Sequence, residues 1–214
     1  MTTTSAISIE SVVNKAPVIP VIVIENLEHA VPLARALYNG GLSVLEITLR
    51  TEMALPAIEK IRTELPEAIV GAGTVNSAKH LQDAVAAGSS FLVSPGSTAS
   101  LLDAAEKQEV PLLPGAATPS EVMNLLERGF YYQKFFPAEA AGGVPMLKSI
   151  GGPLAQVNFC PTGGIDIEKA KNYLALKNVS CVGGSWMAAP GLVNDERWSD
   201  IEALAKAASQ IRSQ

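Results

Sequence analysis

Short apolar runs alternate with longer stretches of helical periodicity from about residue 18 almost to the end of the sequence. This alternation is typical of α/β proteins with a parallel sheet, because each helix returns the chain to the edge from which the next strand starts. The runs predicted to be strands lie at residues 18–24, 43–49, 68–72, 91–94, 110–114, 131–136, 157–161 and 179–183. Eight βα units of roughly 27 residues each predict a compact (β/α)8 TIM barrel.

The whole chain, residues 1–214, is predicted to form a single domain, since no linker, low-complexity tract or change in composition divides it. Residues 1–15 are predicted to form an extra N-terminal helix. Thr118 and Glu121 have the spacing of a capping box at the start of a later helix. An open, doubly wound sheet is the alternative architecture, because the same order of elements would serve it.

Charge and composition exclude several classes of partner. The formal net charge is −5 and no basic run could neutralise phosphates along a duplex, so no nucleic-acid partner is expected. Apolar runs such as residues 18–24 are far shorter than the roughly 20 residues that cross a bilayer, and the start of the chain lacks the pattern of a signal peptide. We therefore expect no membrane partner and a cytoplasmic location. Cys160 and Cys181 lie outside any CxxC pair and are interpreted as buried, reduced thiols.

The predicted second strand carries charged residues on one face. Leu45, Ile47 and Leu49 alternate with a set that includes Glu46 and Arg50. In a barrel the apolar set should contact the helices, so Glu46 and Arg50 should point into the lumen near the carboxyl end of the strand, where barrel enzymes have their active sites. The alternative is a solvated face on an edge strand with an internal ion pair.

Lys134 lies among aromatic residues in the predicted sixth strand, on the same face as Tyr132 and Phe136. Burial together with a nearby cation such as Arg50 favours the uncharged amine, which is the form that attacks a ketone to give a Schiff base. Alternatively, Lys134 extends to the barrel mouth or binds a phosphate as a point charge.

The glycines after the third strand do not form a dinucleotide fingerprint. The third glycine of GxGxxG would fall at position 76, which is Asn76, so Gly71 and Gly73 are interpreted as sites of close backbone packing. Thr74 is a candidate lumenal hydroxyl. No metal site is expected, because the lumenal set offers one carboxylate and no histidine. His29 and His80 are predicted to lie on helices away from the strand ends.

The predicted seventh and eighth strands both end in paired glycines, as Thr162-Gly163-Gly164 and Gly183-Gly184-Ser185. In barrels the loops after these two strands often present backbone N–H groups to a phosphate. The paired glycines therefore predict a phosphate-binding corner, with ordinary turns as the alternative.

Together these motifs resemble the 2-keto-3-deoxy-6-phosphogluconate (KDPG) aldolase family, whose members also include 4-hydroxy-2-oxoglutarate (KHG) aldolases. The resemblance extends over about residues 17–190 and rests on six segments. They are residues 45–50, 71–75, 94–96, 134–139, 159–164 and 183–186. The family resemblance implies a class I aldolase on a (β/α)8 barrel that is trimeric, cytoplasmic and free of cofactors, and that cleaves a phosphorylated 2-keto-3-deoxy sugar acid to release pyruvate.

The resemblance also implies a role for each motif residue. Lys134 would form the Schiff base, Glu46 would be the general acid and base, and Arg50 with Thr74 would hold the carboxylate of the pyruvyl group. Pro95 and Phe136 would line the pocket, and Thr162 would lie near the C4 hydroxyl. The residues implied to receive the distal phosphate are Gly163, Gly164, Gly184 and Ser185.

Three other functions are weighed against KDPG cleavage. One is a related pyruvate aldolase that acts on the galactonate epimer. Another is a phosphate-sugar isomerase or epimerase, in which Lys134 is a fixed charge and Glu46 is the base. A non-catalytic phosphate-binding or assembly protein is the third, and the set of Glu46, Arg50 and Lys134 in one lumen argues against it.

Overall fold

Strands and helices alternate along the chain in the computed structural model, which describes residues 7–211. The strands are β1 (Val18–Ile22), β2 (Val44–Thr48), β3 (Ile69–Gly73), β4 (Leu92–Val93), β5 (Leu112–Leu113), β6 (Gly115–Ala116), β7 (Tyr132–Phe135), β8 (Asn158–Pro161) and β9 (Val182–Gly184). The helices are α1 (Ile9–Val13), η1 (Leu27–His29), α2 (Ala30–Asn39), α3 (Ala54–Glu64), α4 (Ala78–Ala86), α5 (Ala99–Ala105), α6 (Pro119–Glu127), α7 (Gly143–Gly151), α8 (Ile167–Leu174), η2 (Trp186–Ala188), α9 (Pro190–Asn194) and α10 (Trp198–Ser209).

Each run predicted to be a strand overlaps an observed strand, and an additional short strand, β6, follows the fifth run directly. Pro114 separates β5 from β6, and it lacks the N–H group that would continue the ladder. β5 therefore pairs with β4, whereas β6 pairs with β7. The carbonyl of Pro114 still accepts a hydrogen bond from the Lys134 N–H at 2.8 Å, which connects the junction to β7.

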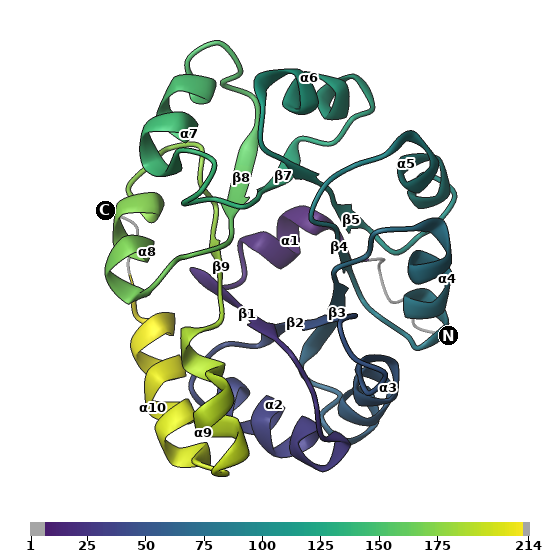
Figure 1. Ribbon diagram of the computed structural model, residues 1–214, viewed down its shortest axis with the longest axis vertical. Helices are drawn as coiled ribbons and strands as arrows, with labels where there is room; N and C mark the ends of the chain where they lie inside the picture. The colour runs from purple at the N-terminus through teal and green to yellow at the C-terminus, as the bar shows by residue number, and fades with distance from the viewer. Residues whose placement is uncertain (1–6, 212–214) are drawn as a thin grey trace.

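All the strand pairs are parallel and the sheet is curled. Six strands pair in the order β5-β4-β3-β2-β1-β9, and three pair in the order β6-β7-β8. Isolated bridges join Phe159 to Val179 and Thr162 to Gly183, between β8 and the segment that contains β9. Figure 1 shows the strands arranged around a centre with helices α2 to α10 outside them. The α/β class with a curled parallel sheet is confirmed.

Two sets of buried side chains lie on the two faces of this sheet. The larger set fills the space between the sheet and the outer helices. The smaller set lies inside the curl and includes Val12 and Val13 of α1, which pack with Ile19, Val44 and Phe91. Figure 1 shows α1 within the ring of strands. Of the helix predicted over residues 1–15, residues 1–6 lie outside the described part of the chain, and α1 covers Ile9–Val13.

Local signals place the helix that precedes β7. The side chain of Thr118 accepts from the Glu121 N–H, Glu121 accepts from the Thr118 N–H, and Pro119 occupies the first turn, so the predicted capping box is confirmed. Gln133 on β7 donates to the carbonyls of Val122 and Phe130, which turns its side chain towards α6. Because side chains alternate along a strand, Lys134 then faces the interior. Within residues 7–211, no helix combines the length and the apolar character needed to cross a membrane.

Candidate active site

A buried ion pair connects β2 with β7 across the interior of the curled sheet. Lys134 Nζ donates to Glu46 Oε1 at 3.3 Å. The two side chains expose 6% and 4% of their surface, respectively. The ammonium also lies 5.4 Å from the centre of the Phe136 ring. Burial of a charge is costly unless the charge is paired and hydrogen-bonded, so this pair is a strong candidate for a functional site.

Gly73 on β3 leaves the space that the Glu46 side chain occupies. A Cβ at this position would overlap Glu46 Oε1 and would lie 2.7 Å from Glu46 Cγ. The carboxylate of Glu46 therefore reaches Lys134 over a strand that carries no side chain at this point. This observation supports the interpretation that Gly73 allows close packing.

We expect Gly73→Ala to displace Glu46 and to lower kcat about 100-fold, because a catalytic group that is misplaced by about 1 Å can cost that much. Overpacking should also reduce the free energy of unfolding by about 1–3 kcal/mol. Steady-state kinetics and urea unfolding measure the two effects. Gly152→Ala is the matched control, because a Cβ there meets nothing closer than the Ser149 carbonyl oxygen at 3.6 Å. Wild-type kcat in Gly73→Ala would show that the position of Glu46 is not critical.

Arg50 and Thr74 lie at the carboxyl ends of β2 and β3 and are hydrogen-bonded to each other. Arg50 Nε donates to Thr74 Oγ1 at 3.2 Å. Thr74 has a φ of 59°, a strained conformation for a β-branched residue and one that is often found at functional sites. The Leu49 N–H donates to the Gly73 carbonyl at 2.8 Å and fixes the two strand ends together. The family resemblance assigns Arg50 and Thr74 to the same carboxylate of the substrate, and this hydrogen bond joins their side chains.

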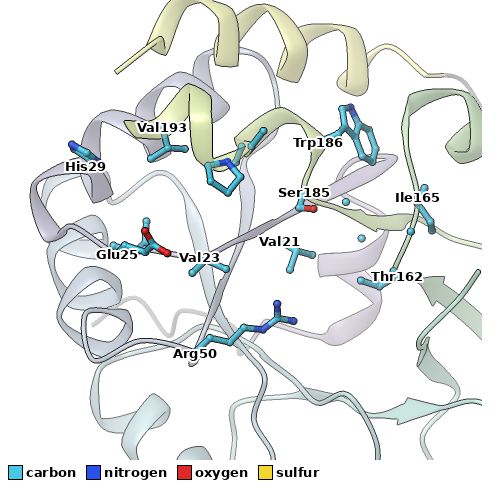
Figure 2. A pocket seen from close by; sticks show the side chains of 18 of the residues that line it. Val21, Val23, Glu25, His29, Arg50, Thr162, Ile165, Ser185, Trp186 and Val193 are labelled. Carbon is cyan, nitrogen blue, oxygen red and sulfur yellow. The ribbon is translucent and has the colours of Figure 1, made fainter. Parts of the chain in front are cut away.

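A pocket of about 500 Å³ opens at the carboxyl ends of the strands. Among the predicted site residues, those that line it are Arg50, Phe136, Thr162, Gly163, Gly164, Gly184 and Ser185. Figure 2 shows the guanidinium of Arg50 directed towards the centre of the pocket, with Thr162 and Ser185 beyond it. Lys134 and Glu46 are not part of this lining, but Phe136 is, and the centre of its ring lies 5.4 Å from Lys134 Nζ.

The paired glycines form one wall of the pocket. Gly163 and Gly164 have φ values of 109° and 75°, so both adopt the left-handed conformation that glycine tolerates best. Successive residues of this kind can direct their N–H groups towards an anion. Thr162 bridges to Gly183 in the neighbouring segment, which brings the two glycine pairs side by side. The arrangement has the features of a phosphate site.

Besides Lys134 and Glu46, two other predicted site residues, Thr74 and Pro95, are not part of the pocket lining. Thr74 contributes through its hydrogen bond with Arg50. Pro95 lies against the backbone of Gly115 after β4, where a Cβ on Gly115 would lie 2.6 Å from the Gly96 nitrogen. Among residues 7–211, no group of three or more His, Cys, Asp or Glu side chains is placed to hold a metal ion.

The sequence did not predict the outer part of the pocket. Its lining there includes Val21, Glu25, Asn26, His29 and Trp186. His29 was expected to lie away from the strand ends, but η1 brings it to the rim, where its Nε2 lies 3.5 Å from Glu196 Oε1. His29 lies on a helical segment, as predicted, because η1 runs directly into α2.

The two cysteines are free and buried, as predicted. Cys160 lies opposite Lys134 in the register of β7 and β8. Its hydrogen bond with Cys181, together with burial, raises the pKa of the Cys181 thiol well above its usual value. The Cys181 thiol is therefore a poor nucleophile in this environment, and Lys134 is the stronger candidate.

A family model for KDPG and KHG aldolase matches residues 9–204. The chain belongs to this family. As a KDPG and KHG aldolase family member it is a carbon–carbon lyase. A KHG/KDPG aldolase of Escherichia coli (strain K12) is 51% identical over 201 residues, which are 94% of each chain.

Solved structures of family members agree with this membership. A KDPG aldolase from Legionella pneumophila, with pyruvate captured as a covalent carbinolamine, has a TM-score of 0.92 and is 50% identical, covering 94% of this chain and 97% of that one. The KDPG aldolase of Zymomonas mobilis ZM4 with 3-phosphoglycerate has a TM-score of 0.89 and 50% identity, covering 95% and 96%.

Proposed function

We propose that this chain is a class I aldolase that cleaves KDPG to pyruvate and glyceraldehyde 3-phosphate through a Schiff base on Lys134. The observation that carries this proposal is the buried Lys134–Glu46 pair, at 3.3 Å, next to Phe136 of a pocket that is also lined by Arg50 and by paired glycines. The Legionella relative supports it, since that protein was captured with pyruvate as a carbinolamine.

Formation of the Schiff base begins with a proton transfer within the ion pair. Glu46 accepts a proton from the Lys134 ammonium, and the free amine attacks the C2 ketone to give a carbinolamine. Glu46 then returns a proton to the C2 hydroxyl, which leaves as water. The resulting iminium at C2 accepts the electron pair that is released when the bond between C3 and C4 breaks.

The same carboxylate can serve the cleavage step. Glu46, directly or through a water, takes the proton of the C4 hydroxyl as the bond between C3 and C4 breaks. Glyceraldehyde 3-phosphate is released and an enamine remains on Lys134. Protonation at C3 and hydrolysis of the imine then give pyruvate and restore the amine.

Arg50 is the residue best placed to bind the carboxylate of the substrate. Its guanidinium points into the pocket, and the hydrogen bond with Thr74 fixes its Nε. A guanidinium can form a two-point contact with a carboxylate, which would orient the iminium plane. Phe136 lines the pocket beside Lys134. We propose that Pro95, which lies against the backbone of Gly115, supports the carboxyl end of β4.

The part of the pocket that is lined by Gly163, Gly164, Gly183 and Gly184, called here the glycine corner, would bind the phosphate at the far end of the substrate. We propose that Gly163, Gly164, Gly184 and Ser185 contact it, and that Thr162 lies near the C4 hydroxyl. The Zymomonas relative, solved with the phosphorylated ligand 3-phosphoglycerate, supports a phosphate site in this family. Cleavage of KHG to pyruvate and glyoxylate is a second proposed activity, favoured by the name of the Escherichia coli relative.

Incubation with pyruvate followed by borohydride tests the proposal. Reduction fixes an imine, so a single reduced pyruvyl adduct should appear in the intact mass and map to Lys134. The same protein should release pyruvate from KDPG. A folded protein without an adduct would favour an aldolase of another class or a phosphate-sugar isomerase.

We further propose that residues 1–214 form one closed (β/α)8 barrel domain with α1 as an added N-terminal helix. The bridges from β8 to the β9 segment and the continuity of β5 and β6 around Pro114 support closure. A homotrimer and a cytoplasmic location are proposed from the family resemblance, and the free cysteines are compatible with a reducing compartment.

A further inference from the structure

Glu139 ends the segment that begins with Lys134, and it lies behind the glycine corner rather than in the pocket. We propose that Glu139, acting through Lys169, is a positioning residue that holds the Gly163–Gly164 loop in the conformation that binds phosphate. Glu139 Oε2 lies 3.0 Å from Lys169 Nζ, and Lys169 Nζ donates to the Gly164 carbonyl at 2.9 Å. This inference rests on the proposed function.

Three successive carbonyl groups of the loop are held from the same side. The Thr162 carbonyl accepts from the Ala138 N–H at 2.8 Å, and the Gly163 carbonyl accepts from the Glu139 N–H at 3.2 Å. Lys169 holds the third, that of Gly164. Residues 138 and 139 thus form two of the three contacts that orient this loop.

The direction of each carbonyl determines the direction of the next N–H group. In a planar trans peptide the C=O of one residue and the N–H of the following residue point in opposite directions. The N–H groups of Gly163, Gly164 and Ile165 therefore point away from residues 138 and 139 and from Lys169. Within residues 7–211, the N–H groups of Gly164 and Ile165 donate to no protein acceptor, and both residues line the pocket.

The third carbonyl is the one that a side chain controls. The Tyr173 hydroxyl, on a fully buried ring, donates to Glu139 Oε1 at 2.6 Å and fixes the carboxylate from behind. The hydrogen bonds from Tyr173 and Lys169 lower the pKa of Glu139, so the carboxylate stays charged at neutral pH. Glu139 also packs against Gly164, because a Cβ there would lie 2.9 Å from Glu139 Cγ.

This arrangement predicts an effect on phosphorylated substrates alone. A nest of oriented N–H groups binds an anion only while the peptides keep their orientation. KHG has no phosphate, and its reacting carbons depend on Lys134, Glu46 and Arg50. Loss of the Glu139–Lys169 contact should therefore weaken KDPG binding and leave KHG cleavage nearly unchanged.

Glu139→Gln tests the inference, since glutamine can still accept from Tyr173 but cannot form the ion pair with Lys169. We expect KM for KDPG to rise about fivefold with little change in kcat, as for the loss of a partly exposed charge contact worth about 1 kcal/mol. Kinetic constants for KHG should stay within about twofold. The dissociation constant of inorganic phosphate, from phosphorus NMR line broadening, should also rise about fivefold.

Glu168→Gln is the matched control, because Glu168 forms an exposed ion pair with Lys171 at 2.7 Å on the same helix. Lys169→Met, at a half-exposed side chain, is a second variant that should reproduce the KDPG effect. Equal losses with KDPG and KHG, or unchanged phosphate binding, would overturn the inference. Tighter phosphate binding in Glu139→Gln would also overturn it, since Lys169 would then act as a free charge. If wild type binds phosphate but does not cleave KDPG, the proposed function fails and the phosphate measurement still tests Glu139.

Discussion

Lys134→Ala should abolish aldol cleavage and lower kcat by at least about 10⁴-fold, a loss typical of removing a covalent nucleophile. The methyl group of alanine cannot attack the ketone. Among residues 7–211, Lys134 is the lysine that forms the buried pair with Glu46. Borohydride after pyruvate should give no reduced adduct in this variant, and mass spectrometry checks this directly.

Loss of the lysine should also destabilise the protein, because Glu46 then remains buried without its partner. Breaking a buried pair in this way costs about 3–5 kcal/mol, which urea unfolding would detect. Lys134→Arg separates chemistry from stability, since it keeps a cation beside Glu46 but offers no reactive amine. Lys148→Ala, at an exposed lysine of α7, is the control and should keep full activity. Cleavage or adduct formation at the wild-type level in Lys134→Ala or Lys134→Arg would exclude the proposed mechanism.

Glu46→Gln should lower kcat by about 10²–10⁴-fold, the range usual for loss of a general acid or base. Glutamine keeps the shape of the side chain and a hydrogen-bond acceptor for Lys134, but it cannot carry a proton between steps. Removal of the carboxylate charge favours the uncharged amine, so some imine should still form with pyruvate. Borohydride trapping should therefore remain positive while turnover falls.

Deuterium exchange at the methyl group of pyruvate separates these steps. The exchange requires the imine to lose and regain a proton at C3, so it should slow in Glu46→Gln by about the same factor as kcat. Glu52→Gln, at an exposed position shortly after β2, is the matched control and should exchange normally. Exchange and cleavage at wild-type rates in Glu46→Gln would assign the proton transfers to another group.

Local patterns predicted much of the strand framework. The period of two in residues 44–50 placed Glu46 in the interior, where the structure has it buried. The paired glycines after the last two strands indicated a loop with unusual backbone conformation, and Gly163 and Gly164 have positive φ values. The separate short strand β6 after Pro114 was missed, although the absent N–H group of proline is a signal that could have indicated a new strand there.

Contacts between residues that are far apart in the sequence could not be predicted from local patterns. The pairing of Lys134 with Glu46 joins residues 88 positions apart, and no local pattern specifies which charges meet inside the curled sheet. No local pattern indicated the left-handed backbone of Thr74, whose hydroxyl accepts a hydrogen bond from Arg50. The rim position of His29 depends on η1 and on its approach to Glu196, contacts that only the folded chain creates.

The sequence by itself determined the alternation of strands and helices, the face of each strand that carries the charged residues, and the glycines that bend the backbone. These properties follow from side-chain periodicity and local backbone preference, which act between near neighbours. The tertiary structure alone decided that Lys134 meets Glu46 and that the segment 138–139 holds the carbonyls of the glycine loop. Those contacts depend on the register and curl of the whole sheet, which is set by the packing of many distant residues at once.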